Sequence, residues 1–443
     1  MKKTYLSAAL CLAVFALFAN VWAAETFNLT TQTPTQGTNW RFDASVSYLC
    51  QGPGTGGHGL CPRTFSVPTL FVNNGANLTI TGNSTVQQNI RVQVEGTVRI
   101  TLNNANIERT GHSVLRDEPQ GGEPKRYITV SPMQIVGEGS HLTLTLVGEN
   151  TLLMENTMDA RWSAGLGVPL GTSVVIEGDG KLTARGGVSA AGIGGHQGGV
   201  PGTHRGTPSG NITINSGTII ATGRELAAGI GNGAHLEGGT ITINGGDVTA
   251  TGGVTTNAQG NPTGGGAGIG GGGSVFTTGN GATWNAPLTI NINGGTVRAV
   301  SQGGSAGIGS GSSGTTNITI NINDGKVTAL GGAHILRGGA GIGGGEFTAG
   351  GRINIRGGTV IATGESGSWG GGAGIGGGGS SGEAHGGIIN ISGGKIFARG
   401  GSRAEHIGGG GFSNATGPGA SQGGQVRIAP DVEVSNQIPS GTQ

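Results

Sequence analysis

Apolar and polar residues alternate along short segments that recur between residues 174 and 407. In one unit, Ile241 and Ile243 alternate with threonines, and Val248 and Ala250 do the same after a Gly-Gly turn. Alternation with period two predicts β-strands whose apolar side chains share one face. Each unit closes with Ala-Gly-Ile-Gly, which recurs at 191–194, 228–231, 267–270, 306–309, 340–343 and 373–376, with a degenerate copy at 406–408.

The length of the repeat predicts how the strands assemble. The isoleucines of the Ala-Gly-Ile-Gly segments lie 32 to 39 residues apart, a spacing typical of solenoids, in which one unit cannot bury its apolar face alone. Three short strands per unit describe one coil of an all-β, parallel β-helix with Gly-rich loops and coils about 4.8 Å apart. Like residues then stack in three ladders: Ile214, Ile243, Ile292, Ile322, Ile355 and Ile391; Ala221, Ala250, Ala299, Ala329, Ala362 and Ala398; and Ile193, Ile230, Ile269, Ile308, Ile342, Ile375 and Ile407.

The residues between the inward isoleucines are polar. In a β-helix they face outward and stack into a polar ladder, in which the amides and hydroxyls satisfy one another. The predicted ladder consists of Thr213, Thr242, Asn291, Asn321, Asn354 and Asn390.

The N-terminus has the features of a secretory signal peptide. Lys2 and Lys3 precede an apolar run that ends at Val21-Trp22-Ala23, and this run is too short to be interpreted as a membrane span. We therefore expect a secreted or cell-surface protein without a direct membrane span. The predicted organisation is a signal peptide at 1–23, an N-terminal cap at 24–66, irregular coils at 67–187, regular Gly-rich coils at 188–428 and a C-terminal tail at 429–443.

Cysteine usage agrees with export. Cys11 lies in the signal peptide, which leaves Cys50 and Cys61 in the mature chain. Two cysteines separated by a Gly- and Pro-rich loop favour a disulfide in an oxidising compartment. The alternative, a metal site, would need more nearby ligands than His58 supplies.

Composition narrows the class of partner. Gly accounts for 99 of 443 residues, which without a period would suggest disorder, but only 11% of residues are charged and Ile, Val and Thr recur in register. Removing Lys2 and Lys3 from the 24 basic residues leaves 22 against 23 acidic ones, a net charge of −1. A near-neutral chain gives no reason to expect nucleic acid or an anionic membrane as a partner.

Before the regular repeats, alternating strands are predicted at Leu78–Ile80, Ile90–Val94, Val98–Leu102, Ile128–Val130 and Leu142–Leu146. Two loops interrupt them, at 109–126 and 154–163. Loops on rigid scaffolds are where binding residues tend to lie, although solvated loops with internal ion pairs explain the same charges. The candidate ligand contacts in these loops are Arg116, Asp117, Glu118, Lys125, Arg126, Asp159, Arg161 and Trp162.

Two further tryptophans, Trp284 and Trp369, are expected in loops. A flat aromatic ring in a loop can stack on a sugar face, and a buried cap over a coil edge is the competing use. We include both, with Trp162, among the candidate sugar contacts.

Four segments carry a resemblance to a known group of proteins. They are Leu142–Asn150, Ala164–Pro169, Gly171–Gly178 and Gly180–Gly187, and Ala-Gly-Ile-Gly units follow them. The chain resembles secreted bacterial Gly-rich proteins of the carbohydrate-binding or adhesin-like type, which are similar to the pectate-lyase-like superfamily. The resemblance implies a right-handed β-helix and a polysaccharide or cell-surface glycan as partner. It also implies a possible calcium ion, for which no ligand residue carries over.

Catalysis is the main alternative. Polysaccharide hydrolases need paired carboxylates, and lyases need a calcium cage with a basic residue, whereas Asp179, Asp247 and Asp324 lie at Gly-containing turns where Asp is a turn former. We assign no catalytic residue, no metal ligand and no cofactor.

The leading hypothesis is a non-catalytic polysaccharide-binding or adhesin-like protein. The alternatives are a polysaccharide lyase or glycoside hydrolase, and a passive structural rod at the surface or in a matrix.

Overall fold

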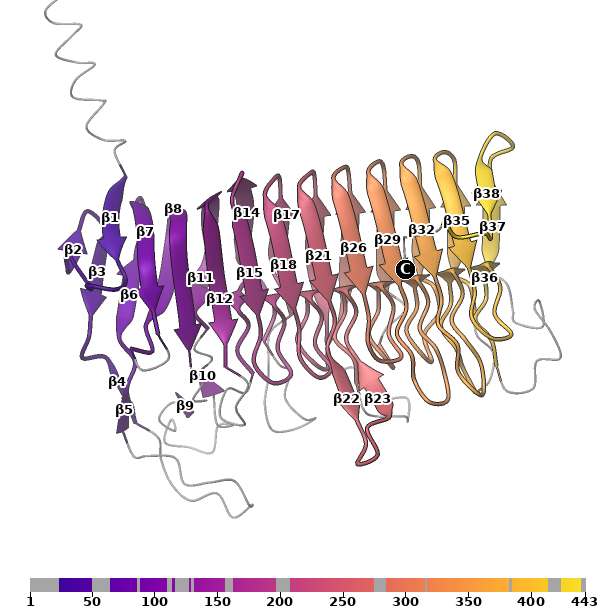
Figure 1. Cartoon of the computed structure of the whole chain (residues 1–443), viewed down its shortest axis with the longest axis horizontal. Helices are drawn as coiled ribbons and strands as arrows, with labels where there is room; N and C mark the ends of the chain where they lie inside the picture. The colour runs from indigo at the N-terminus through magenta and orange to yellow at the C-terminus, as the bar shows by residue number, and fades with distance from the viewer. Residues whose placement is uncertain are drawn as a thin grey trace, which may run out of the picture.

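All elements that the structure describes are β-strands. The computed structural model describes residues 24–49, 64–85, 88–109, 114–115, 127–128, 131–155, 162–196, 208–274, 284–314, 317–381, 385–412 and 424–439. Thirty-two strands join in one sheet that winds into successive coils, with parallel pairing from one coil to the next. Figure 1 shows the coils stacked along the long axis, from the indigo N-terminal end to the yellow C-terminal end. The right-handed parallel β-helix expected from the sequence is confirmed.

Three strand ladders run along the coils. The first ladder contains β1 (Glu25–Asn28), β7 (Asn77–Ser84), β8 (Arg91–Arg109), β11 (Met133–Val147), β14 (Ser173–Gly178), β17 (Asn211–Ile214), β20 (Leu236–Ile243), β25 (Trp284–Ile292), β28 (Ile318–Ile322), β31 (Arg352–Ile355), β34 (Ile388–Ile391) and β37 (Gln425–Ile428). The second ladder continues from the ends of β7 and β8 through β12 (Glu149–Met154), β15 (Lys181–Arg185), β18 (Thr218–Thr222), β21 (Asp247–Thr251), β26 (Thr296–Val300), β29 (Lys326–Leu330), β32 (Thr359–Thr363), β35 (Lys395–Arg399) and β38 (Glu433–Ser435).

The third, or corner, ladder is built from the shortest strands. It begins with β6 (Thr69–Val72), which pairs with the start of β8, and continues through the start of β11. It then runs through β13 (Leu166–Gly167), β16 (Ile193–Gly194), β19 (Ile230–Gly231), β24 (Ile269–Gly270), β27 (Ile308–Gly309), β30 (Ile342–Gly343), β33 (Ile375–Gly376) and β36 (Ile407–Gly408).

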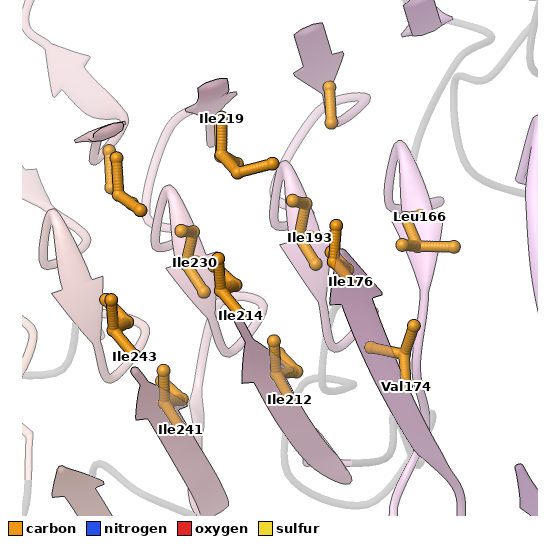
Figure 2. Close-up of a cluster of buried hydrophobic side chains, with 14 of the residues drawn as sticks. Leu166, Val174, Ile176, Ile193, Ile212, Ile214, Ile219, Ile230, Ile241 and Ile243 are labelled. Carbon is orange, nitrogen blue, oxygen red and sulfur yellow. The ribbon is translucent and has the colours of Figure 1, made fainter. Parts of the chain in front are cut away.

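The core consists of the predicted side-chain ladders. Ile214 pairs with Ile243, Ala221 with Ala250 and Ile193 with Ile230, and every later step of the three predicted series is also paired in register. Apart from Ile407, which is partly buried, these side chains are at most 2% exposed. Figure 2 shows the isoleucines of neighbouring coils pointing into the same interior. The period-two pattern therefore fixed both the strand type and the face that is buried.

Glycines at the corners allow the coils to approach closely. A Cβ on Gly341 would lie 2.6 Å from the Thr363 nitrogen and 2.7 Å from the Gly374 oxygen, both backbone atoms of the next coil. Gly343 has a φ of 125°, which L side chains rarely adopt. The Gly residues of the Ala-Gly-Ile-Gly segments are therefore required by backbone crowding and by backbone conformation.

Aromatic residues cover the N-terminal end of the solenoid. Phe27 of β1 lies edge-to-face on Trp40, with ring centroids 5.8 Å apart, and Phe42 lies 5.2 Å from Phe27. Trp40 and Phe42 belong to β3 (Trp40–Asp43), which pairs antiparallel with β6 and with β2 (Gln36–Gly37). The Trp40 Nε1–H donates to the Glu25 carboxylate. Cys50 and Cys61, and the signal peptide predicted at 1–23, lie outside the described residues.

Three predictions about local structure were wrong. Ile128 does not start a coil strand: β10 (Tyr127–Ile128) pairs antiparallel with β9 (Val114–Leu115), apart from the solenoid sheet. Arg109 does not begin an exposed loop, because it ends β8 as a fully buried side chain. Trp284 is not in a loop but starts β25, since β20 and β25 extend their pairing to Leu236 and Trp284.

The loops of the coils gather on one side of the solenoid. Figure 1 shows them below the strands, with the hairpin of β22 (Val254–Thr256) and β23 (Pro262–Gly265) projecting farthest among the labelled elements there. A third two-stranded sheet, β4 (Ser47–Leu49) with β5 (Thr64–Ser66), lies near the N-terminal end. At the other end, β38 extends the second ladder into the segment that the sequence assigns to the tail.

The predicted outward polar ladder is confirmed in the regular coils. Asn321 Nδ2 donates to Asn291 Oδ1 at 2.9 Å, Asn354 donates to Asn321 at 2.9 Å, and Asn390 donates to Asn354 at 3.1 Å. Asn291 donates to the Thr242 hydroxyl at 3.5 Å. From the coil of Thr242 to that of Asn390, each coil is therefore tied to the next by side-chain amides as well as by backbone hydrogen bonds.

Candidate functional site

The loop side carries an exposed aromatic surface late in the solenoid. Trp369 is 43% exposed and Ile335 is 49% exposed, although both lie in well-packed coils. We define the Trp369 platform as Ile335, Arg337, Phe347, Trp369 and Arg403. A half-exposed indole is a flat apolar surface of the kind on which a sugar ring can stack.

Hydrogen bonds between successive loops position the platform. The Trp369 N–H donates to the Leu336 carbonyl at 2.8 Å, and the Ser368 Oγ donates to the Ile335 carbonyl at 3.0 Å. From the following coil, Arg403 Nη1 lies 3.3 Å from the Ser368 carbonyl and 3.4 Å from that of Trp369. The backbone around Trp369 is therefore held from the coils on both sides.

Arg337 lies between two aromatic rings. Its Cζ is 4.0 Å from the ring centroid of Phe347 and 4.7 Å from that of Trp369. Cations over aromatic faces are attracted by the ring quadrupole, more strongly where they are desolvated, and Arg337 is 6% exposed. The guanidinium therefore supports the inner side of the indole and fixes its orientation.

A buried acid lies next to this arginine. Burial raises the pKa of Glu346 to about 8, against the opposing effect of Arg337. Its Oε2 lies 3.1 Å from His334 Nδ1, and burial, followed by the charge of Arg337, lowers the pKa of His334. Both shifts favour the uncharged forms, so at neutral pH this contact joins two mainly neutral groups and is not an ion pair.

His196 is a second buried histidine, at the corner of the coil after β13. Burial lowers its pKa to about 4, and its Nδ1 accepts the Ala164 N–H at 3.2 Å. A neutral, buried imidazole that accepts a backbone N–H has a structural role, so we do not include it in the site.

The predicted site residues have different outcomes. Trp369 lies in a loop, as expected, and its side chain is exposed rather than buried as a cap. Trp162 adopts a φ of 70° and is partly buried, with its N–H bonded to the Val188 carbonyl at 2.8 Å, and Trp284 starts a strand. The predicted residues outside the described part of the chain are Arg116, Asp117, Glu118, Lys125, Arg126, Asp159 and Arg161.

The sequence analysis missed the residues under Trp369. His334, Arg337 and Glu346 interrupt the Gly-rich segments 331–340 and 344–349. Charged residues that interrupt a Gly-rich repeat on consecutive coils were the available signal. The sequence alone did not show that they meet the tryptophan of the next coil.

Comparison with known proteins bears on the fold. A family model described as a β-helix repeat matches residues 174–199, 212–234, 290–312, 320–346 and 353–379. These matches start in or next to first-ladder strands and extend through the corner ladder. The chain is a parallel β-helix protein. No curated protein and no solved structure matches it.

The described part of this β-helix protein contains no group of three or more His, Cys, Asp or Glu side chains placed to hold a metal ion. Its described residues also include no helix that is long and apolar enough to cross a bilayer. The chemistry that the Trp369 platform supports is stacking and hydrogen bonding to a ligand surface, with Arg403 as its exposed cation.

Proposed function

We propose that this β-helix protein is a non-catalytic polysaccharide-binding or adhesin-like protein that acts outside the cytoplasm, in secreted form or at the cell surface. The observation that carries the proposal is the half-exposed Trp369, held on stacked loops beside Ile335 and over the buried Arg337. Aromatic side chains that are fixed before binding contribute contact area at little entropic cost. The signal-peptide features around Lys2 and Lys3 support export.

Binding of the purified full chain to an array of polysaccharides and cell-surface glycans tests the proposal. We expect binding, and we expect Trp369→Ala to weaken it by roughly 5- to 30-fold, which corresponds to about 1–2 kcal/mol for a buried aromatic contact. Leu170→Ala is the matched control, because Leu170 is a similarly exposed apolar residue (48%) outside the platform. EDTA is included because the resemblance implies calcium, and a loss of binding with EDTA would add calcium as a bridging ion. A wild-type chain that binds nothing on the array would contradict the proposal.

A further inference from the structure

The outward face of the first ladder carries a regular grid of two residue types. Four consecutive strands, β17, β20, β25 and β28, each contribute two outward residues, and the residue after each strand adds a third. All twelve positions hold Thr or Asn. We call this surface the Asn/Thr grid: Asn211, Thr213, Asn215, Thr240, Thr242, Asn244, Thr289, Asn291, Asn293, Thr319, Asn321 and Asn323.

Charged residues begin where the grid ends. The coil before it carries Glu177 at the third position, and the coil after it carries Arg352 and Arg356 at the first and third positions. The outward face of the second ladder is different, since Arg298 and Phe397 lie at the central positions of β26 and β35. An array that is free of ionisable side chains over four coils is therefore confined to one face.

Hydrogen bonds along the solenoid fix the orientation of the grid amides. In the outer column, Asn244 donates to Asn215 at 2.8 Å, Asn293 to Asn244 at 2.8 Å, and Asn323 to Asn293 at 2.7 Å. A side-chain amide has two N–H donors and an oxygen with two lone pairs, and this ladder uses one of each. Asn244 and Asn293 are exposed, so each keeps a donor and an acceptor for a ligand in an orientation that repeats with the coils.

The chemistry of the grid selects among ligand classes. A hydroxyl both donates and accepts hydrogen bonds, and so matches alternating amide and hydroxyl groups. A charged polymer would lose hydration without gaining a counter-charge on the grid, and a protein interface would need an apolar centre that these side chains do not provide. We propose that the Asn/Thr grid binds an uncharged polysaccharide chain, which lies along the solenoid axis and bonds to successive coils through its hydroxyls. This inference rests on the polysaccharide-binding function proposed above and names the class of polysaccharide.

The test compares neutral polysaccharides (cellulose, chitin, mannan and xylan) with uronic-acid polysaccharides, each immobilised, at low and at high salt. The full chain carries either wild-type residues or the pair Thr289→Val and Thr319→Val, which removes two grid hydroxyls outside the amide ladder. Valine suits a strand as well as threonine does. The matched control is Thr249→Val, an outward residue in the centre of β21 on the other face. Circular dichroism checks that each variant is folded.

We expect the wild-type chain to bind at least one neutral polysaccharide with an affinity that salt does not change, because the grid has no charge to screen. The double variant should bind roughly tenfold more weakly, in line with the loss of two hydrogen bonds, whereas Thr249→Val should bind as the wild type does. If the double variant bound neutral polysaccharides as tightly as the wild type, the Asn/Thr grid would not be the binding site. The same conclusion would follow if the chain bound uronic-acid polysaccharides only. Either result would leave the Trp369 platform as the site. A wild-type chain that binds no polysaccharide would overturn both proposals.

Discussion

Individual residues in this solenoid take the charge state that their burial allows. Glu346 is 4% exposed and His334 lies against it, yet the pKa shifts of both groups favour their neutral forms. Arg337 remains charged although burial lowers its pKa, because a guanidinium keeps its proton in proteins. A salt bridge between Glu346 and His334 would require the opposite shifts, so the contact joins two neutral groups rather than an ion pair.

The raised pKa of Glu346 predicts a loss of stability in mild alkali. Between its ordinary pKa of 4.5 and about 8, the unfolded chain ionises while the folded chain keeps the proton. The folded state then binds more protons, so the free energy of unfolding falls as pH rises, by up to about 1.4 kcal/mol per pH unit. In the unfolded chain the histidines with lowered pKa values still bind protons near their ordinary pKa of 6.5. They are neutral in both states only above about pH 7.5, so the effect of Glu346 is measured there.

Urea unfolding at about pH 7.5 and about pH 8.5 measures this effect. The wild-type midpoint should fall across the interval, and Glu346→Gln, which mimics the protonated acid, should remove most of the fall. A fall of equal size in the Gln variant would assign the pH dependence to another group.

At the scale of the element, one repeat position shows what the corner glycines do. Gly341 and Gly374 occupy it in successive coils, with backbone atoms of the next coil 2.6 to 2.7 Å from the place a Cβ would take. In the last coil of the corner ladder the same position holds His406. No further corner strand follows β36 among the described residues. Glycine is thus required by the coil stacked on top of it.

This explanation predicts different costs for two substitutions at equivalent positions. Gly341→Ala should lower the free energy of unfolding by about 1–3 kcal/mol, because only backbone movement can make room for the methyl group. His406→Ala should cost less than about 1 kcal/mol, mainly from the lost acceptance of the Gly400 N–H. Urea midpoints of the two variants against the wild type measure the difference. Equal costs would show that crowding by the next coil does not select the glycine.

The ladders were predictable from the sequence because the repeat places equivalent residues one coil apart. The alternation around Ile243 and Ala250 fixes strand type, face and register together. The irregular coils lack that redundancy: Ile128 was assigned to a coil strand from a three-residue alternation, which an antiparallel pair outside the solenoid shares. The Trp369 platform could not be predicted from the sequence, because Arg337, Phe347 and Trp369 meet only after consecutive coils are stacked.

At the scale of the whole molecule, the two ends of the solenoid differ. Aromatic residues around Trp40 cover the N-terminal end. At the C-terminal end, Glu405 replaces the alanine of the repeat, and its Oε2 accepts the Gly409 N–H at 2.8 Å. In earlier coils the carbonyl of the following coil accepts this N–H, as Gly376 does for Gly344 and Gly408 does for Gly377. The Glu405 carboxylate therefore takes the place of a further coil and ends the corner ladder.

Substituting Glu405 should destabilise the last coil alone. In a solenoid each coil contacts only its neighbours, so Glu405→Ala should raise the rate of hydrogen exchange at the Gly409 amide by roughly tenfold, as expected for one lost hydrogen bond to a charged acceptor. Exchange in β30, two coils away, should stay at the wild-type rate. Glu405→Gln keeps an acceptor oxygen and should restore most of the protection. The matched control is Glu365→Ala in the preceding coil, since its carboxylate accepts only from the neighbouring Ser366 N–H among the bonds of the described residues. If Glu405→Ala left the Gly409 amide as protected as before, the end of the corner ladder would owe its stability to backbone packing rather than to this side chain.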